Sequence, residues 1–357
     1  MSETATGTDR NAVLESFLTH AGWASARRLP LAGDASPRRY LRLKGGSGAS
    51  AVLMDARPEH GAESRRFAAI ARHLRAMGFS APEILAEAPE AGLMLLEDLG
   101  DDLFARVLER DRLQEHTLYA AATDLLAALH AHPAPEGTAS YDAATMGELA
   151  ALALDWYAGG ISAPGTAGAP FPAPPDGEDR ARFAQTVAAL CDRLAPVGTA
   201  LALRDFHAEN LIWLPQREGH ARVGLLDFQD ALRAHPAYDL VSLLEDARRD
   251  VSAPVRHAMT RRYIAATGRE AAAFTAALAC LGAQRNLRIL GVFARLCLRD
   301  GKPGYLPLLP RVWGCLMADL DHPALAPLAA LVARLLPAPT PERIERIASQ
   351  CPSGPRR

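Results

Sequence analysis

The stretch covering residues 201–230 constrains the fold of this chain more than any other. It contains two short apolar runs, residues 211–214 and 223–226, separated by a polar turn with Gly219. Two such runs around a turn predict a small β-hairpin. Carboxylates and amides border both runs, namely Asp205, Glu209, Asn210, Asp227, Gln229 and Asp230. Folding the hairpin brings these groups to one end, where their oxygens suit a hard cation such as Mg²⁺.

The spacing of three of these residues resembles the catalytic loop and metal-binding segment of kinases. Asn210 follows Asp205 by five positions, and Asp227 directly precedes Phe228. In kinases the first aspartate accepts the proton of the attacking hydroxyl, and the asparagine and second aspartate hold Mg²⁺ on the nucleotide phosphates. The resemblance implies that Asp205 is catalytic, that Asn210 and Asp227 are metal ligands, and that ATP and Mg²⁺ are required.

Several motifs resemble the aminoglycoside phosphotransferase and choline kinase-like family of small-molecule kinases more than protein kinases. They are GDASPRRY at 33–40, LLEDLGD at 95–101, DFQD at 227–230 and YDLVSLLED at 238–246. Within the family they look most like the bacterial anomeric sugar kinases, which phosphorylate N-acetylmuramate and N-acetylglucosamine during peptidoglycan recycling. The resemblance covers residues 10–335. It implies a bilobal α+β kinase-like fold, with an antiparallel-sheet lobe over residues 1–98 and a mostly helical lobe over residues 99–357.

Other functions share this fold. An aminoglycoside or choline-type kinase would need acidic groups or an aromatic cage around its cationic acceptor. A non-catalytic binding protein would keep the kinase-like fold without turnover. A regulatory protein kinase is disfavoured because no Ala-Pro-Glu segment follows Asp227 to end an activation loop.

The first hundred residues predict a small lobe of strands with two helices, over residues 11–20 and 63–77. The family resemblance implies that residues 33–40 cover the triphosphate, with Ala35, Ser36, Arg38 and Arg39 near its oxygens. It also implies that the backbone of Glu97 and Leu99 binds the adenine edge. Asp98 and Asp101 have an alternative use as caps of the following helix.

Two positions depart from the usual kinase pattern. Met54 stands at or next to the position of the phosphate-binding lysine, so another cation is needed there. The candidates are Arg38, Arg39, Arg42 and Arg57, because a guanidinium fork suits phosphate oxygens. Glu63, which matches the usual partner of that lysine, then loses its standard role. The second departure is Leu203, where the catalytic loop of the family usually begins with a histidine that supports the loop.

The sequence after residue 101 is mostly helical. Residues 159–178, rich in Pro, Gly and Ala, predict a long loop that is either a substrate lid or a plain linker. The resemblance implies that Asp239 anchors the catalytic loop by hydrogen bonds. His207, Gln229 and Asp230 are candidates either for binding the substrate or for holding the loop.

The predicted helix over residues 284–299 gives the best indication of the acceptor. On a helical wheel, Arg285, Arg288, Arg295 and Arg299 fall within an arc of about 80°. Either these arginines form the exposed face of a buried helix or pair with acidic residues elsewhere, or one or two of them, Arg285 or Arg288, face the acceptor. Such a wall would repel a polycationic aminoglycoside and attract the carboxylate of N-acetylmuramate.

Length and composition narrow the class further. A chain of 357 residues with a formal charge of −2 and no basic block favours two lobes, a small-molecule partner and no nucleic acid. No apolar run approaches the ~20 residues of a membrane span, and the polar start lacks the core of a signal peptide. We expect a cytoplasmic monomer whose five cysteines, without a CxxC pair, are buried free thiols.

Overall fold

The computed structural model describes residues 4–31, 38–46, 48–56, 61–162 and 175–352. The chain forms two compact units. The first comprises Met1–Leu125 and Ala208–Ala231, and the second comprises Leu126–His207 and Leu232–Arg357. The hairpin that carries Asn210 and Asp227 therefore belongs with the N-terminal sheet, although residues 126–207 separate the two in the sequence.

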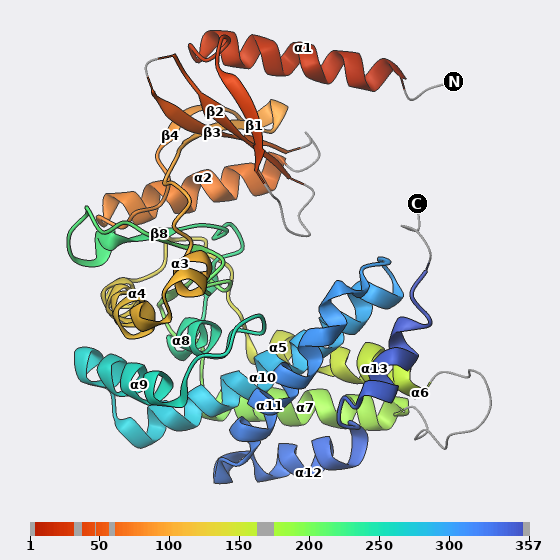
Figure 1. Ribbon diagram of the computed structural model, residues 1–357. Coiled ribbons are helices and arrows are strands. Elements are labelled where there is room, and N and C mark those ends of the chain that lie inside the picture. The colour runs from red at the N-terminus through yellow and green to blue at the C-terminus, as the bar shows by residue number, and fades with distance from the viewer. Residues whose placement is uncertain (1–3, 32–37, 47, 57–60, 163–174, 353–357) are drawn as a thin grey trace. The chain divides into compact units, whose positions relative to one another are not determined.

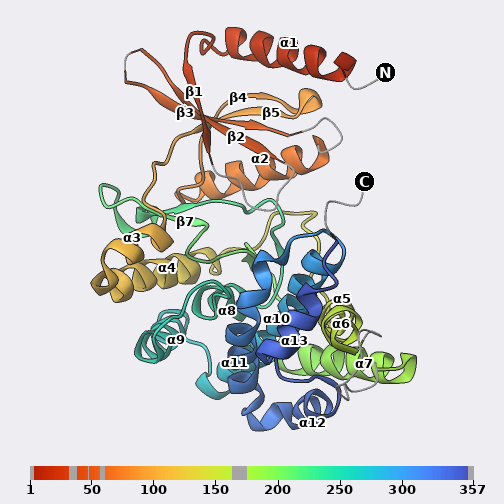
Figure 2. The same cartoon turned by 45° about the vertical axis from the view of Figure 1, so that its right-hand side comes forward.

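A five-stranded antiparallel sheet dominates the first unit, in the order β1-β2-β3-β5-β4. Figures 1 and 2 show helices α1 (Thr4–His20) and α2 (Gly61–Ala76) on opposite faces of this sheet. The strands are β1 (Arg27–Leu31), β2 (Arg39–Lys44), β3 (Ser50–Asp55), β4 (Ile84–Ala88) and β5 (Leu93–Glu97). A 3₁₀ turn, Pro89–Ala91, joins β4 to β5, which pair antiparallel as a hairpin.

Alternation along the strands determines which residues each face of the sheet buries. Leu43 of β2 and Leu53 of β3 pack with Leu14 and Leu18 of α1 in one apolar cluster. Residues one position away point to the opposite face. Met54 is fully buried there and pairs across the strands with Tyr40.

The remainder of the first unit contains α3 (Phe104–Arg110), the start of α4 (Glu115–Leu129) and the predicted hairpin. The hairpin strands, β7 (Leu211–Trp213) and β8 (Val223–Leu225), pair antiparallel. Single bridges join Leu103 to Ile212 and Ser80 to Gly224. These bridges attach the hairpin to segments that precede it by more than a hundred residues.

The described residues of the second unit form mostly helices, with one short strand pair, β6 (Leu201–Ala202) with β9 (Leu232–Arg233). Helix α10 (Ala271–Leu298) runs through its middle, beside α5 (Ala143–Leu152), α8 (Ala237–Leu244) and α11 (Leu309–Leu320) (Figures 1 and 2). The other described helices of this unit are a π-helical turn (Ala153–Ala158), α6 (Gly159–Ser162), α7 (Gly177–Leu194), α9 (Ala253–Thr267), α12 (Ala326–Leu335), α13 (Pro341–Ala348) and two 3₁₀ turns (Pro303–Leu308 and Pro323–Leu325).

Close packing along α10 requires glycine. A Cβ atom at Gly291 would lie 2.3 Å from the backbone carbon of Leu152, and one at Gly282 would lie 2.5 Å from the Asp319 carboxylate. The neighbouring Asn286 donates hydrogen bonds to Glu245 (2.7 Å) and Asp319 (3.1 Å). Burial raises the pKa of both carboxyl groups, so this cluster joins α10 to α11 and to the end of α8 with less charge than two carboxylates would carry.

Some predicted segments lie partly outside the described residues. The ends of the predicted loop at 159–178 are helical, in α6 and α7, and residues 163–174 are not among those described. The same is true of Ala35, Ser36 and Arg57. All five cysteines are free thiols, as predicted, but burial is confirmed only for Cys191, Cys280 and Cys297, because Cys315 and Cys351 are half-buried.

None of the described helices is by itself long and apolar enough to cross a membrane. A bent pair, Pro303–Leu320 with Pro323–Leu335, meets the length and composition criteria jointly across a break of 102°.

His235 makes the stability of the second unit sensitive to acid. Burial lowers the pKa of this imidazole to about 4, whereas an unfolded histidine titrates near 6.5. The unfolded chain therefore binds the proton first, and stability is lost as pH falls from about 6.5 to about 4, by up to ~3 kcal/mol. His235→Asn should flatten this slope in denaturant titrations at several pH values. The exposed His257→Gln is the control, and equal slopes in wild type and His235→Asn would contradict the prediction.

Candidate functional site

Two residues of the predicted site have strained backbones. Among the described residues other than glycine, only Arg204 (φ 74°) and Asp227 (φ 56°) have positive φ angles. A left-handed conformation costs a residue with a side chain about 1–2 kcal/mol and is common at functional sites. Both positions come from the motif that predicted the site, one directly before Asp205 and the other at the predicted metal ligand.

A buried carboxylate holds the strained turn at Arg204. Asp239 of α8 accepts hydrogen bonds from the backbone N–H groups of Leu203 (2.6 Å) and Arg204 (2.8 Å). Asp205 N–H then donates to the Leu203 carbonyl oxygen at 2.9 Å, which closes a tight turn. The predicted anchoring by Asp239 is confirmed. Two charge-assisted hydrogen bonds stabilise the turn by more than the strain at Arg204 costs.

An imidazole from another part of the chain lies beside this carboxylate. His130, just after α4, places Nε2 3.8 Å from Asp239 Oδ2 and its Nδ1 2.8 Å from the Tyr263 hydroxyl. Leu203, which replaces the usual histidine of the loop, is buried. The loop therefore keeps an imidazole near its anchor, although the sequence around Leu203 contains no sign of it.

In the first unit, the hairpin brings Asn210 and Asp227 to the same end. Leu211 pairs with Leu225, and the Leu226 N–H donates to the Asn210 carbonyl oxygen at 2.9 Å. Asp227 is exposed, and Gln229 donates to its Oδ1 at 2.9 Å. The next residue, Phe228, is fully buried and stacks on Phe67 of α2 with ring centroids 4.8 Å apart.

The donor set at this end fits a cation that is shared with a phosphate. An amide oxygen and a carboxylate are hard ligands, and Mg²⁺ commonly takes one or two protein oxygens and completes its shell with substrate phosphates and water. The described residues contain no group of three or more His, Cys, Asp or Glu side chains able to hold a metal without such help.

Helix α10 places a cation, Arg288, among aromatic side chains of the second unit. Arg288 of α10 donates to the Tyr238 hydroxyl at 3.2 Å, and Tyr238 packs edge-on against Tyr141, with centroids 5.4 Å apart. Burial opposes the charge of Arg288, but Tyr238, Tyr141 and Asp205 together raise its pKa above the ordinary value. Arg288 is therefore a protonated, mostly enclosed cation within electrostatic reach of Asp205.

His207 is also buried in the second unit. Burial is the main cause that lowers its pKa below the ordinary value, against the opposite effects of Asp246 and Asp205. The imidazole is therefore neutral near pH 7, which suits a hydrogen-bonding role better than a charged one.

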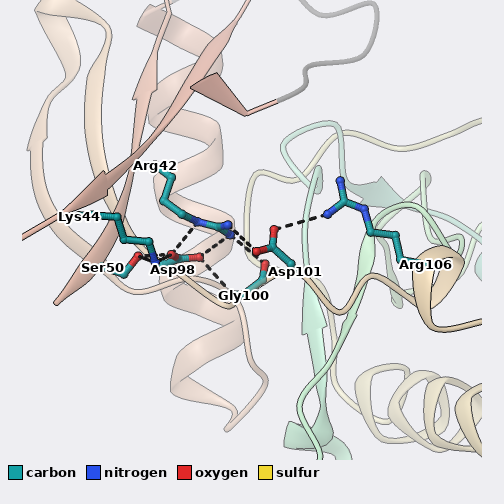
Figure 3. A network of polar contacts seen from close by, with 7 residues as sticks. All are labelled: Arg42, Lys44, Ser50, Asp98, Gly100, Asp101 and Arg106. Carbon is teal, nitrogen blue, oxygen red and sulfur yellow. Dashed lines mark hydrogen bonds and ion pairs between the residues drawn. The ribbon is translucent and has the colours of Figure 1, made fainter. Parts of the chain in front are cut away.

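The segment after β5 is fixed to the sheet by charge (Figure 3). Arg42 Nε lies 2.8 Å from Asp98 Oδ2, and its Nη1 donates to Asp101 at 2.5 Å. Burial opposes ionisation of Asp98, but hydrogen bonds from Ser50, the Gly100 N–H and Arg42 hold its pKa below the ordinary value. Helix α3 begins without a side-chain cap at Leu103, so neither aspartate caps it.

The two neighbouring residues predicted to bind adenine are also held in the first unit. The Glu97 N–H donates to the Glu83 carbonyl oxygen at 2.8 Å, and its carboxylate accepts from Arg217 at 2.6 Å. Leu99 packs with Ile212 and Leu214 of the hairpin. The polar and apolar contacts together hold the backbone of this segment in place.

The predicted arginine candidates for phosphate contact have different partners. Arg38 lies 3.4 Å from Glu63 of α2, measured from Nη2 to Oε2. Arg39 pairs with Asp55 at 2.7 Å and has a 61% exposed side chain. Arg42 is bound to the two aspartates after β5, as described above.

Comparison with known proteins decides the family. The model of the family described as "Phosphotransferase enzyme family" matches residues 28–275. The chain belongs to this family. A relative named N-acetylmuramate/N-acetylglucosamine kinase from Caulobacter vibrioides is 40% identical over 93% of this chain and 98% of its own. A relative of the same name from Pseudomonas aeruginosa is 33% identical over 94% and 98%.

Solved structures show the fold of this phosphotransferase. The choline kinase LicA from Streptococcus pneumoniae has a TM-score of 0.57 at 13% identity, with 87% of this chain and 99% of that one covered. The ADP-bound aminoglycoside phosphotransferase APH(2″)-Ib has a TM-score of 0.56 at 12% identity, covering 86% and 98%. The predicted α+β kinase-like fold is confirmed.

The arginines predicted to form one stripe on α10 of the phosphotransferase have separate environments. Arg285 is buried and donates to Ser242 Oγ and to the Glu245 carbonyl oxygen, both at 3.1 Å, so its contacts are structural. Arg299 is exposed and pairs with Asp300 at 2.6 Å. The interpretation of a single exposed face is therefore wrong, because α8 and the residues after it cover Arg285.

Gln229 and Asp230, the last two residues of the DFQD motif and candidates for binding the substrate or holding the loop, differ in burial. Gln229 is 4% exposed and contacts Asp227, whereas Asp230 is exposed. Sequence reasoning missed Tyr141, Gln284 and His130. Gln284 donates to the Tyr141 hydroxyl at 3.3 Å, a contact that joins residues 143 positions apart and leaves no local pattern.

Loss of the Asp239 carboxylate should damage both stability and turnover of the phosphotransferase. Asp239→Asn turns an amide N–H₂ toward one of the two N–H donors, which leaves a buried donor unsatisfied at a cost of about 1–3 kcal/mol. We expect a lower melting temperature and a kcat at least ~10-fold lower, since the turn before Asp205 loosens. Circular dichroism and a phosphotransfer assay measure the two effects. Asp192→Asn, on the exposed face of α7, is the control, and wild-type kcat in a folded Asp239→Asn would contradict the prediction.

Proposed function

We propose that this phosphotransferase transfers the γ-phosphoryl group of ATP to the anomeric hydroxyl of N-acetylmuramate or N-acetylglucosamine. The acceptor class follows the names of relatives that match nearly the whole chain. The observation that carries the chemistry is the strained Arg204–Asp205 turn held by Asp239, together with the paired Asn210 and Asp227 at the hairpin end. We place the enzyme in the cytoplasm, as a monomer in peptidoglycan recycling.

In the proposed reaction, Asp205 orients the sugar hydroxyl and accepts its proton as the bond to phosphorus forms. The bond from the γ-phosphorus to the bridging oxygen breaks, and ADP leaves with that oxygen. Asn210 and Asp227 would hold Mg²⁺, which when bound neutralises charge on the phosphates. Gln229 fixes one oxygen of Asp227 by its hydrogen bond and so limits rotation of that carboxylate.

We also propose that Arg288 binds the carboxylate of N-acetylmuramate. Its guanidinium lies within electrostatic reach of Asp205, and the one hydrogen bond recorded for it among the described residues is with the neutral Tyr238 hydroxyl. A mostly enclosed cation with a neutral partner favours an anionic ligand. A cationic aminoglycoside or choline would be repelled there, so this environment favours the sugar over the alternative acceptors.

Replacement of Asp205 by Asn should lower kcat by ~10² to 10⁴-fold and leave nucleotide binding nearly unchanged, because only the proton acceptor is lost. An ADP-release assay with both amino sugars, choline and an aminoglycoside gives turnover, and phosphorus NMR of the product gives the position phosphorylated. Turnover with choline or the aminoglycoside alone would contradict the acceptor class. Wild-type kcat in Asp205→Asn would contradict the assigned role.

Replacement of Arg288 by Gln should separate the two sugars. The KM for N-acetylmuramate should rise by ~10 to 100-fold, since charge-assisted hydrogen bonds to its carboxylate are lost. The KM for N-acetylglucosamine, which has no carboxylate, should change much less. Arg299→Gln, on the exposed end of the same helix, is the matched control. Equal losses for both sugars would show that Arg288 acts on Asp205 and does not recognise the carboxylate.

A further inference from the structure

The strand that carries the phosphate-binding lysine in kinases has no cation here. In kinases this lysine lies on the third strand and pairs with a helix glutamate. In this chain the third strand ends with Met54 and Asp55. Met54 is fully buried, and Asp55 points to the other face, where it pairs with Arg10 of α1. The third strand therefore supplies no positive charge to the face that bears α2.

The strand register identifies where a cation could come from instead. Tyr40 of β2 pairs with Met54 of β3, so their side chains share a face. Arg38 lies two positions before Tyr40 and, by alternation, is directed to the same face. The ion pair confirms this direction, because Arg38 Nη2 lies 3.4 Å from Oε2 of Glu63, in the first turn of α2.

Arg38 is a protonated cation close to acidic groups of the first unit. Burial opposes its charge, but Tyr40, Asp227 and Glu63 raise the pKa of the guanidinium above its ordinary value. Asp227 is the predicted metal ligand, and it belongs to the same unit as Arg38 and Glu63. The Arg38 side chain is 8% exposed, compared with 33% for Glu63, so the cation is the more enclosed member of the pair.

The other two described arginine candidates form ion pairs with other carboxylates. Arg39 binds Asp55 on the α1 side of the sheet, and Arg42 binds Asp98 and Asp101. Among the arginines weighed from the sequence and described in the structure, Arg38 is thus the one that contacts Glu63 of α2, and Asp227 is among the groups that raise its pKa.

We infer that Arg38 has taken over the phosphate-contacting role of the kinase lysine, so that the cation has moved from β3 to the residue directly before β2. The planar guanidinium has five donors, and this geometry allows it to bind Glu63 on one edge and phosphate oxygens on another. A single ammonium at residue 54 would provide only a point charge. This inference rests on the proposed use of a nucleoside triphosphate.

The inference is tested by comparing the affinity for ADP, which carries phosphates, with the affinity for adenosine, which carries none. Isothermal titration calorimetry would measure the binding of Mg·ADP and of adenosine to wild type, Arg38→Gln and the control Arg66→Gln. Arg66 lies on the exposed side of α2, so its substitution removes the same charge from the same unit. Arg38→Gln should weaken Mg·ADP binding by ~10 to 100-fold and leave adenosine binding unchanged, because the inferred contact between the guanidinium and the nucleotide is through the phosphates alone.

Three outcomes separate the possibilities. Equal Mg·ADP affinity in wild type and Arg38→Gln would overturn the inference and leave the proposed function intact. Equal weakening of ADP and adenosine binding would overturn it in favour of a structural role. Absence of Mg·ADP binding and of turnover in wild type would instead overturn the proposed function.

A second variant tests whether the charge has moved between strands. Arg38→Gln combined with Met54→Lys restores a lysine at the usual kinase position, opposite Tyr40 in the register. We expect this double variant to recover at least ~3-fold of the lost Mg·ADP affinity, since the new ammonium can pair with Glu63. A double variant that is folded by circular dichroism and shows no recovery would overturn the relocation. If it does not fold, the ratio of ADP to adenosine affinity in Arg38→Gln remains decisive.

Discussion

Asp239 accepts hydrogen bonds from two consecutive backbone N–H groups, and the geometry of the turn before Asp205 in the second unit depends on them. The carboxylate is fully buried, and its hydrogen bonds to Leu203 and Arg204 replace the water it has lost. Their stabilisation exceeds the strain of a left-handed arginine, so the turn persists and Asp205 has a defined position. A flexible loop would have to be ordered in each catalytic cycle, whereas this one is ordered during folding.

The placement of positive charge is the second constraint on the structure. The neighbours of each arginine determine whether it has a structural role or is available to a ligand. Arg42 binds two aspartates after β5, Arg285 supports the end of α8, and Arg288 lies near Asp205. Arginine is thus structural at positions 42 and 285, whereas at position 288 we propose that it binds the substrate. What differs is the partner, because a guanidinium bound to protein carboxylates or carbonyl oxygens is less able to bind a ligand than one bound to a neutral hydroxyl.

Local patterns predicted the elements whose residues are adjacent in the sequence. The hairpin around Gly219 was predictable because apolar runs and a polar turn encode it directly, and the meeting of Asn210 with Asp227 follows from its pairing. The prediction that the arginines of α10 share one exposed face was wrong because it depends on contacts between helices, which local patterns do not contain. A helical wheel gives the direction of each arginine but not which helix covers it, and Ser242 with the Glu245 carbonyl oxygen covers Arg285.

The sequence alone determined the family, the kinase-like fold and the three polar residues at kinase spacing, because these depend on local order and on motifs. Only the tertiary structure decided that Arg38 contacts Glu63, that His130 lies beside Asp239, that Arg285 supports the end of α8, and that Asp205 acts on the charge of Arg288. The physical reason is that each of these contacts joins residues on different elements. Their proximity is produced by packing, and a one-dimensional pattern contains no record of it.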